Sequence, residues 1–338
     1  MHMADALLSP AVGGTMWTVS ALTIAYCSRK VRAVASDSLP PLMGVLGAFI
    51  FAAQMINFTI PVTGSSGHLG GGLLLAILLG PEAAFLTIAS VLVIQAFFFA
   101  DGGLLALGCN IFNLGFFPAF VAYPLIYRKC IGSPPTPARI TTVSMFAAVI
   151  GLQLGAFAVV VETVASGITA IPFSAFAVIM QPIHLAIGIV EGVVTASVIS
   201  FVSRARPEII KDNLSTGTIA GRSLRPLLFI LLTITILTGG VLSRFASRQP
   251  DGLEWSIAKV TGGQEPAAPN HGIHTMLAIL QDTCAILPGY SFRVPTPVQQ
   301  RGEKNGTATS ISGLAGGAVI LLISCILPFL LRRRRRQP

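Results

Sequence analysis

The amino-acid sequence predicts an all-α integral membrane protein, built as a seven-span helical bundle followed by a C-terminal two-span hairpin. Its 338 residues are 53% hydrophobic and only 10% charged, with a mean hydropathy of +0.78. A soluble domain carries about 25% charged residues. So few charges do not solvate a surface of this size in water, and the apolar runs are too long and too numerous for one soluble core.

Nine apolar runs are candidate membrane spans, since a helix needs roughly 20 apolar residues to cross a bilayer. They occupy residues 11–28, 41–60, 69–80, 83–100, 104–127, 140–161, 167–190 with an extension to 203, 226–243 and 311–331. The run 69–80 is shorter than the others and ends at Pro81. Its length alone leaves it open between a short span and a re-entrant helix.

The basic residues predict the topology, because cytoplasmic loops of membrane proteins are enriched in Lys and Arg. They cluster at 29–32, 128–139, 204–225 and 332–336, whereas the short loops on the opposite side contain none. This alternation places the N-terminus outside and the C-terminus in the cytoplasm of a multi-pass protein of the cell inner membrane. It also requires 69–80 to cross. The other basic residues lie in the outer loop 244–310, which is long enough to be translocated regardless of its charge.

Composition divides the chain into three parts. Residues 1–205 form the seven-span membrane domain, 206–225 a polar cytoplasmic linker, and 226–338 a two-span hairpin with the long outer loop. The net charge of +9 is also found in nucleic-acid-binding proteins, but here the basic residues lie in short clusters between apolar runs. We therefore expect the lipid bilayer, and no nucleic acid, as a partner.

His2 lies in a setting that suits a transition-metal ion. Residues 1–10 lack the pattern of a signal peptide, so the chain is expected to keep its own N-terminus. The Met1 α-amine, the His2 backbone nitrogen and the His2 imidazole then form two adjoining chelate rings. These three nitrogens lie nearly in one plane, an arrangement that suits Ni(II) or Cu(II). A second imidazole would complete the plane.

His68 is the candidate for that fourth position. It lies in the stretch PVTGSSGHLGGG between two predicted spans, on the same outer side as Met1. The surrounding glycines allow backbones to approach one another closely. A flexible loop beside tightly packed helices is the alternative interpretation of this stretch.

Three further ionisable residues, Glu162, His184 and Glu191, lie in or beside predicted spans, where such residues are commonly functional. His184 and Glu191 are seven residues apart and share one face of a helix. Together the three residues suggest an alternative function, a self-sufficient ion-coupled secondary transporter in which they relay protons.

The chain has no recognisable catalytic motif. We find no GxxxxGK[ST] phosphate-binding loop, no nucleophile elbow and no HExxH, so an enzyme is not expected and any ATP would be hydrolysed by another chain. An intramembrane metalloenzyme that uses the histidines is a further alternative without a supporting motif. His271 and His274, in the outer loop, are expected to be solvated, because Pro269 and Gly272 disfavour a helix there.

Three separated motifs resemble the CbiM/NikM substrate-capture component of energy-coupling-factor nickel and cobalt transporters. They are MHMADALLSP at 1–10, PVTGSSGHLGGGLLLAILLGP at 61–81 and ADGGLLALGCNIFNLG at 100–115. The similarity covers about residues 1–205. PDGLEWS at 250–256 is similar to the signature of the two-span N-type accessory component, here fused to the first domain.

The resemblance implies a seven-span bundle whose outward N-terminus is tucked into the protein. It implies that Ni(II) or Co(II) is the transported substrate rather than a catalytic cofactor, held by the Met1 amine, the His2 backbone nitrogen and imidazole, and His68. It also implies a transmembrane coupling (T/Q) subunit and cytoplasmic ATPase (A/O) subunits as partners. At the opening, Met3-Ala4 replaces the common Ile-Pro and Ala6-Leu7 the common Gly-Phe. Nothing in the sequence separates nickel from cobalt.

Overall fold

The structure, a computed structural model, describes residues 2–34, 39–132, 134–207, 209, 224–263, 266, 269, 272–293 and 306–335. Most of the predicted linker 206–225 therefore lies outside the described residues, and so does Met1. The described chain is nearly all helical, apart from one short two-stranded sheet. The prediction of an all-α integral membrane protein is confirmed.

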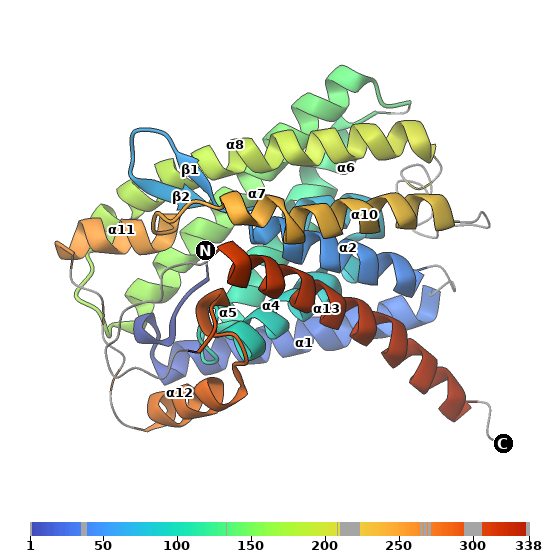
Figure 1. The fold of residues 1–338 in the computed structure, drawn as a ribbon. Coiled ribbons are helices and arrows are strands. Elements are labelled where there is room, and N and C mark those ends of the chain that lie inside the picture. Colours follow the sequence, from blue (N-terminus) through green and yellow to red (C-terminus); the bar gives the residue numbers. More distant parts are fainter. Residues whose placement is uncertain are drawn as a thin grey trace.

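The first domain contains eight α-helices and one π-helical segment, η2, among the described residues (Figure 1). They are α1 (Pro10–Val34), α2 (Leu39–Gln54), α3 (Gly72–Leu79), α4 (Pro81–Phe99), α5 (Leu107–Ile111), η2 (Phe112–Tyr127), α6 (Arg128–Cys130), α7 (Pro137–Ser166) and α8 (Phe173–Ala205). Helices α5, η2 and α6 follow one another without a break and form a single rod, Leu107–Cys130. Gly80, with φ of +83°, separates α3 from α4 in a backbone conformation that favours glycine.

The C-terminal part contributes two long helices and two short ones. They are α10 (Arg225–Gly240), α11 (Gly252–Thr261), α12 (Ile273–Cys284) and α13 (Gly306–Arg335), with 3-10 turns η3 (Leu242–Phe245) and η4 (Pro288–Tyr290) between them. Both long helices pack on α2 (Figure 1). They approach each other at Gly239 and Gly313, where a side chain on Gly313 would come within 2.8 Å of the Gly239 carbonyl oxygen.

Six described helices are long and apolar enough to cross a membrane. They are Pro81–Phe99, Leu107–Cys130, Pro137–Ser166, Phe173–Ala205, Arg225–Phe245 and Gly306–Ser324. The predicted span 41–60 corresponds to the shorter apolar helix α2, of 16 residues. The predicted span 11–28 lies within α1, whose many Gly, Ser and Thr residues make it less apolar than these six.

The predicted span 69–80 is helical only in α3, which has 8 residues. A helix of this length rises about 12 Å, well short of the roughly 30 Å hydrocarbon core. All eight residues are buried, so other helices rather than lipid surround α3. The segment is therefore a short helix inside the bundle, and the extended residues before it carry His68.

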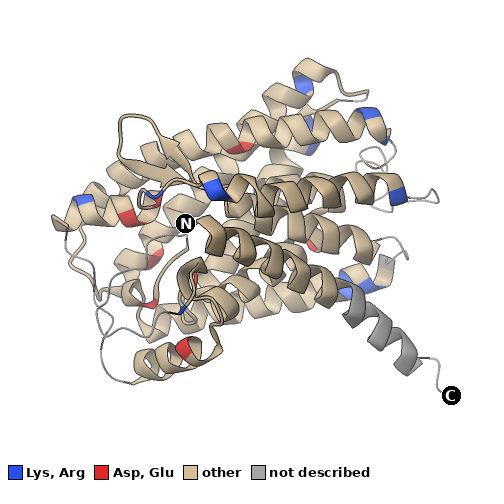
Figure 2. Ribbon diagram, in the orientation of Figure 1, with Lys and Arg blue, Asp and Glu red and all other residues tan. Residues whose placement is uncertain are grey.

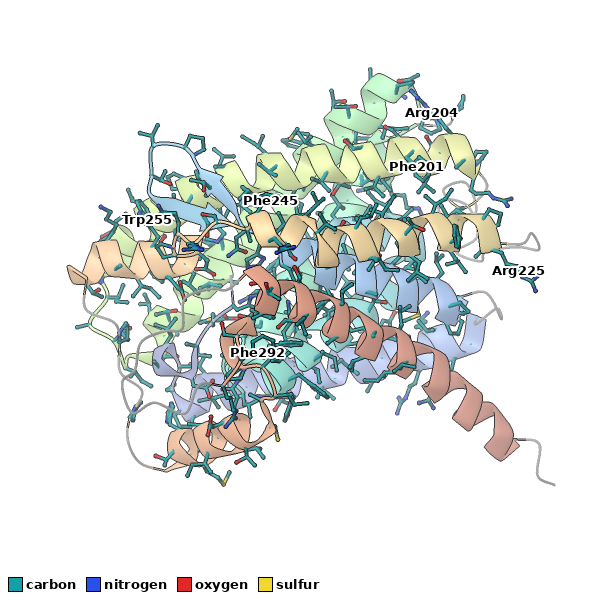
Figure 3. All side chains as sticks on the ribbon, viewed as in Figure 1. Phe201, Arg204, Arg225, Phe245, Trp255 and Phe292 are labelled. Carbon is teal, nitrogen blue, oxygen red and sulfur yellow. The ribbon has the colours of Figure 1, made fainter. Side chains whose placement is uncertain are left out.

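Charge is distributed unequally between the two ends of the bundle. A group of basic residues lies at one end, where α1 and α8 finish and α10 begins, whereas most acidic residues and several further basic residues lie at the other end (Figure 2). Arg204 and Arg225 mark the basic end, and Trp255 lies at the opposite end (Figure 3). The first described residues also lie at that opposite end, among α11, α13 and the sheet (Figure 1).

Candidate metal centre

The N-terminal segment is held inside the protein by the motif at 100–115. Met3 is fully buried, its backbone N–H donates to Oδ1 of Asn110 at 2.8 Å, and its carbonyl accepts from the Gly103 N–H at 2.9 Å. Oδ1 of Asp5 accepts from the Ala106 N–H at 2.9 Å. A side chain on Gly103 would overlap Asp5, so this motif needs glycine for the segment to lie so close.

His68 is positioned by a small hairpin and by a carboxylate. Strands β1 (Phe58–Ile60) and β2 (Ser65–Gly67) pair antiparallel, with Phe58 opposite Gly67, and His68 follows β2 directly. After it, the backbone N–H groups of Gly70 and Gly71 donate to the two carboxylate oxygens of Glu191, at 2.9 and 3.1 Å. Glu191 on α8 therefore fixes the glycine-rich segment that carries His68.

The two predicted imidazoles lie face to face. The ring centroids of His2 and His68 are 5.0 Å apart, with an interplanar angle of 19°. Nδ1 of His68 lies 3.1 Å from the Leu69 carbonyl oxygen, which places a proton on Nδ1. Both residues line a cavity of about 150 Å³, and the His2 side chain is only 7% exposed.

Polar side chains surround His2 on the other sides. Its Nδ1 lies 3.6 Å from Oδ1 of Asp101, and the Tyr290 hydroxyl donates to the other oxygen of that carboxylate. Beneath the site, Gln95 donates to Gln54 at 2.8 Å, and Gln54 donates to the Gly70 carbonyl at 3.0 Å. This network links α2, α4 and the His68 segment.

Burial keeps both imidazoles neutral. It lowers the pKa of His68 to about 3, and the nearby His2 acts in the same direction. Burial also lowers the pKa of His2, although the negative charge of Asp101 opposes the shift. A neutral imidazole has the lone pair that a metal ion requires, so neither ring has to lose a proton at neutral pH before an ion binds.

The C-terminal part contributes a carboxylate to the same cavity. Asp251 lines it together with His2 and His68 and caps α11, accepting from the Glu254 N–H at 2.7 Å. The segment before it is bound to the sheet, since the Ser66 N–H donates to the Pro250 carbonyl at 2.7 Å. The Ser66 hydroxyl donates to the Gln249 carbonyl at 2.8 Å.

A second contact corrects the expectation that His274 is solvated. His274 lies in the first turn of α12, is only 4% exposed, and its Nε2 lies 2.9 Å from the Leu8 carbonyl oxygen. Gly272, with its positive φ, is the residue directly before this helix. It therefore precedes the helix and does not interrupt it. His271 lies outside the described residues. His274 therefore ties the C-terminal part to the N-terminal segment.

The structure brings together two of the three predicted ligand residues, His2 and His68, and the third, Met1, lies outside the described residues. Within the described part of the chain, no three His, Cys, Asp or Glu side chains form a ready ion site. The predicted donor set has only two side chains, so such a cluster is not required.

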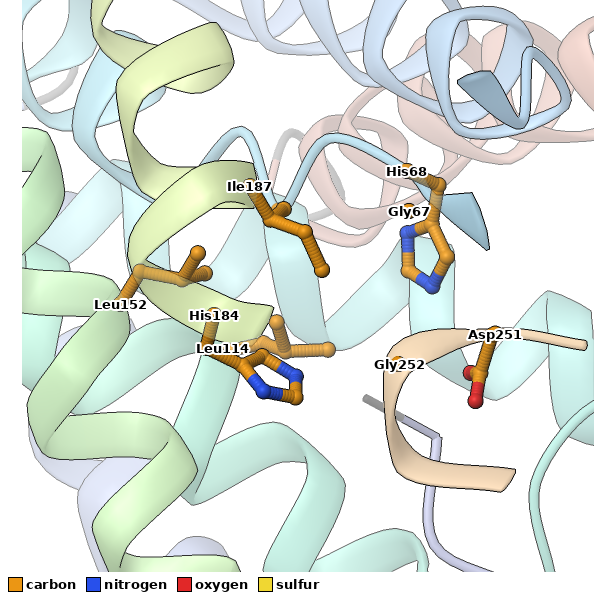
Figure 4. A pocket seen from close by; sticks show the side chains of 9 residues that line it. Gly67, His68, Leu114, Leu152, His184, Ile187, Asp251 and Gly252 are labelled. Atoms are coloured by element: carbon orange, nitrogen blue, oxygen red, sulfur yellow. The ribbon is translucent and has the colours of Figure 1, made fainter. Parts of the chain in front are cut away.

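Glu162, His184 and Glu191 are buried but have separate contacts. Asn113 donates to Glu162 at 2.7 Å, and Glu191 binds the glycine-rich segment. His184 lies in a small cavity with His68 and Asp251 (Figure 4). The sequence did not identify Asp101 or Asp251 as residues of this site, although both lie within the motifs ADGG and PDGLE.

Two known families match separate parts of the chain. Residues 2–209 match the family described as cobalt uptake substrate-specific transmembrane region. Residues 225–333 match the PDGLE domain.

Individual relatives are transport proteins. A probable fused nickel transport protein LarMN of Lactiplantibacillus plantarum is 33% identical over 88% of this chain and 94% of its own length. A putative metal transport protein of Haloquadratum walsbyi is 36% identical over 62% of this chain and 93% of its own. A putative fused nickel transport protein NikMN of Archaeoglobus fulgidus is 36% identical over 65% of this chain and 71% of its own.

A solved structure shares the architecture of the first domain. The crystal structure of a transition metal transporter covers 64% of this chain and 98% of its own, with 29% identity and a TM-score of 0.55. The first domain accounts for most of the chain. The chain is a multi-pass membrane protein of the CbiM family of cobalt uptake substrate-specific transmembrane proteins, fused to a PDGLE domain.

Proposed function

We propose that this chain captures Ni(II) or Co(II) on the outer side of the cell membrane, as the substrate-specific component of an ATP-driven uptake transporter. The observation that carries the proposal is the pair of largely buried, neutral imidazoles of His2 and His68, stacked at 5.0 Å beside a cavity of about 150 Å³. The names of the relatives, which are nickel and metal transport proteins, support it.

The donors of the proposed site are the Met1 amine, the His2 backbone nitrogen, the His2 imidazole and His68. Four nitrogens in a plane disfavour Mg(II) and Ca(II), which prefer oxygen, and Zn(II), which is usually tetrahedral in proteins. Cu(II) would bind at least as strongly as nickel. Only Nδ1 of His2 can close the second chelate ring, and Asp101 lies 3.6 Å from this nitrogen.

The charge distribution supports an outward N-terminus and a cytoplasmic C-terminus. The basic ends of α1 and α8 and the start of α10 lie together (Figure 2), as expected for the cytoplasmic side. The candidate metal centre lies at the opposite end. Since the sequence has no phosphate-binding loop, release of the ion is assigned to a transmembrane coupling (T/Q) subunit and cytoplasmic ATPase (A/O) subunits.

The PDGLE domain is proposed to load and close the site. Its described contacts reach all three segments that form the metal centre: Ser66 beside His68, Leu8 of the N-terminal segment, and Phe98 at the end of α4. The N–H groups of Ile286 and Leu287 both donate to the Phe98 carbonyl, at 3.0 and 3.1 Å. Deletion of 226–338 should therefore lower uptake strongly, and undiminished uptake would contradict this role.

The amine is the donor that can be tested without changing any side chain. One residue added before Met1 moves the α-amine out of place. Removing one of four nitrogen donors should cost on the order of 100-fold in Ni(II) affinity, since a complete four-ligand site contributes about 10–16 kcal/mol. Titration calorimetry on the purified chain, compared with the native N-terminus, measures this loss. Unchanged binding would exclude the Met1, His2 and His68 site.

The proton-relay alternative has no specific observation in its favour. Glu191 is bound to the backbone of Gly70 and Gly71, and Glu162 to Asn113. These contacts suit residues that position the bundle. Ion uptake by the purified chain alone, reconstituted without any ATPase, is the result that would support a self-sufficient transporter.

A further inference from the structure

A third buried histidine faces the metal centre from inside the bundle. His184 on α8 is fully buried, and its Nδ1 lies 2.8 Å from the Met180 carbonyl oxygen. This contact places the proton on Nδ1, so Nε2 carries a lone pair. Within the described residues, Nε2 of His184 has no hydrogen-bond partner. A buried nitrogen of this kind requires a physical explanation.

The space beside this nitrogen is small and has polar groups on one side. His184, His68 and Asp251 line a cavity of about 10 Å³, and Leu114, Leu152 and Ile187 form its apolar walls. The imidazole of His184 extends from α8 toward the side on which His68 and Asp251 lie (Figure 4). About one water-sized particle fits into such a volume, so the cavity also has the size of one bare ion.

This small cavity and the larger one at His2 share two residues. His68 and Asp251 line both, whereas His2 lines only the outer cavity and His184 only the inner one. His68 therefore stands between His2 and His184. The backbone at Gly252 also packs close to His184, since a side chain on this glycine would come within 3.3 Å of the His184 ring.

We propose that His184 is a second ion-binding residue, which receives the divalent ion from His68 as it moves from the outer site into the bundle. This rests on the proposed function of the outer site. Imidazole is a suitable ligand for Ni(II) and Co(II), and the carboxylate of Asp251 offsets part of the ion's charge. No electron is transferred. The bond from the metal to Nε2 of His184 forms as the bond to the His2 backbone nitrogen breaks, and that nitrogen regains its proton from water.

A cysteine at this position tests direct contact with the ion. Thiolate bound to Co(II) absorbs in the near ultraviolet, and this band is absent when no sulfur ligand is present. We expect the His184→Cys full-length chain to show such a band on titration with Co(II), and the His184→Ser chain to match the native chain, which contains five cysteines. If His184→Cys shows no more absorption than His184→Ser, the ion does not reach residue 184 and the proposal is wrong.

Uptake provides the second arm of the test. In the complete transporter, His184→Ala should lower Ni(II) uptake at least tenfold while the affinity measured by calorimetry stays within about threefold of the native chain. The control is Thr195→Val, which changes another buried residue of the same helix. Normal uptake by His184→Ala would overturn the proposal, and so would equal losses of binding and uptake, which indicate a merely structural role. A chain extended before Met1 tests the outer site alone, so failure of that site is recognised separately.

Discussion

The CbiM-family domain and the PDGLE domain meet at the candidate metal centre, but they contribute different chemistry. The first supplies both imidazoles, and the side chain of Asn110 and the glycines at 102–103 hold the first of them in place. The second supplies the carboxylate of Asp251 and the hydroxyl of Tyr290, and it contacts the surrounding segments through both backbone and side-chain groups. From this difference we expect the family domain to determine which ion binds and the PDGLE domain to determine how well the site is closed.

The largest expected effect lies in the family domain. Asn110→Ala removes the acceptor of the buried Met3 N–H, which costs about 1–3 kcal/mol. Because this contact docks the N-terminal segment, we expect Ni(II) affinity to fall about tenfold or more. Asn113→Ala is the matched control, since Asn113 is equally buried but bonded to Glu162. Calorimetry on both variants distinguishes loss of docking of the N-terminal segment from a general loss of packing. If the two variants bind Ni(II) equally tightly, Asn110 does not have this docking role.

A second prediction concerns the stability of the metal-free protein at low pH. The pKa of His68 is lowered to about 3 from 6.5, so below about pH 6.5 the unfolded chain binds a proton that the folded chain does not. The folded state is therefore favoured most above the pKa that His68 has in the unfolded chain. This advantage is lost as the pH falls toward the pKa that His68 has in the folded chain. The unfolding temperature should therefore drop between about pH 7 and 4, and less steeply in His68→Gln. Identical profiles of the two proteins would rule out a neutral, buried His68.

The smallest effect is expected in the PDGLE domain. Asp251→Asn preserves the cap of α11, because Asn caps helices as well as Asp, but removes a charge from the cavity. We expect Ni(II) affinity to fall about fivefold, corresponding to about 1 kcal/mol of electrostatic interaction. Asp282→Asn is the control, since this carboxylate is 77% exposed on α12. If both variants bind as tightly as the native chain, Asp251 contributes only the helix cap.

The sequence was most informative where apolar runs are long. The four spans that correspond to α4, the rod Leu107–Cys130, α7 and α8 were predicted close to their observed positions, because the bilayer sets a minimum length and excludes charge. It was least informative at 69–80, where the apolar run is as hydrophobic as a span but its helix is short and fully buried. Composition does not distinguish a segment covered by lipid from one covered by protein.

The outer loop shows the same limitation. Pro269 and Gly272 were expected to disfavour a helix near His274, and that histidine was expected to be solvated. In the structure, α11 and α12 form there, and His274 is buried against Leu8. The partners of these helices lie about 180 to 270 residues earlier in the chain, and local pattern carries no information about contacts so distant.

The sequence by itself determined that the chain is a helical membrane protein and indicated which residues are suited to a planar nitrogen site, because span length, charge and chelate-ring size are local properties. Only the tertiary structure decided that the rings of His2 and His68 stack with their centroids 5.0 Å apart. It also decided that Glu191 binds the short segment between His68 and α3, and that Asp251 lines the same cavity as the two histidines. These contacts join segments separated by 66 to 249 residues. Their geometry follows from how the helices and the sheet pack, which no local pattern encodes.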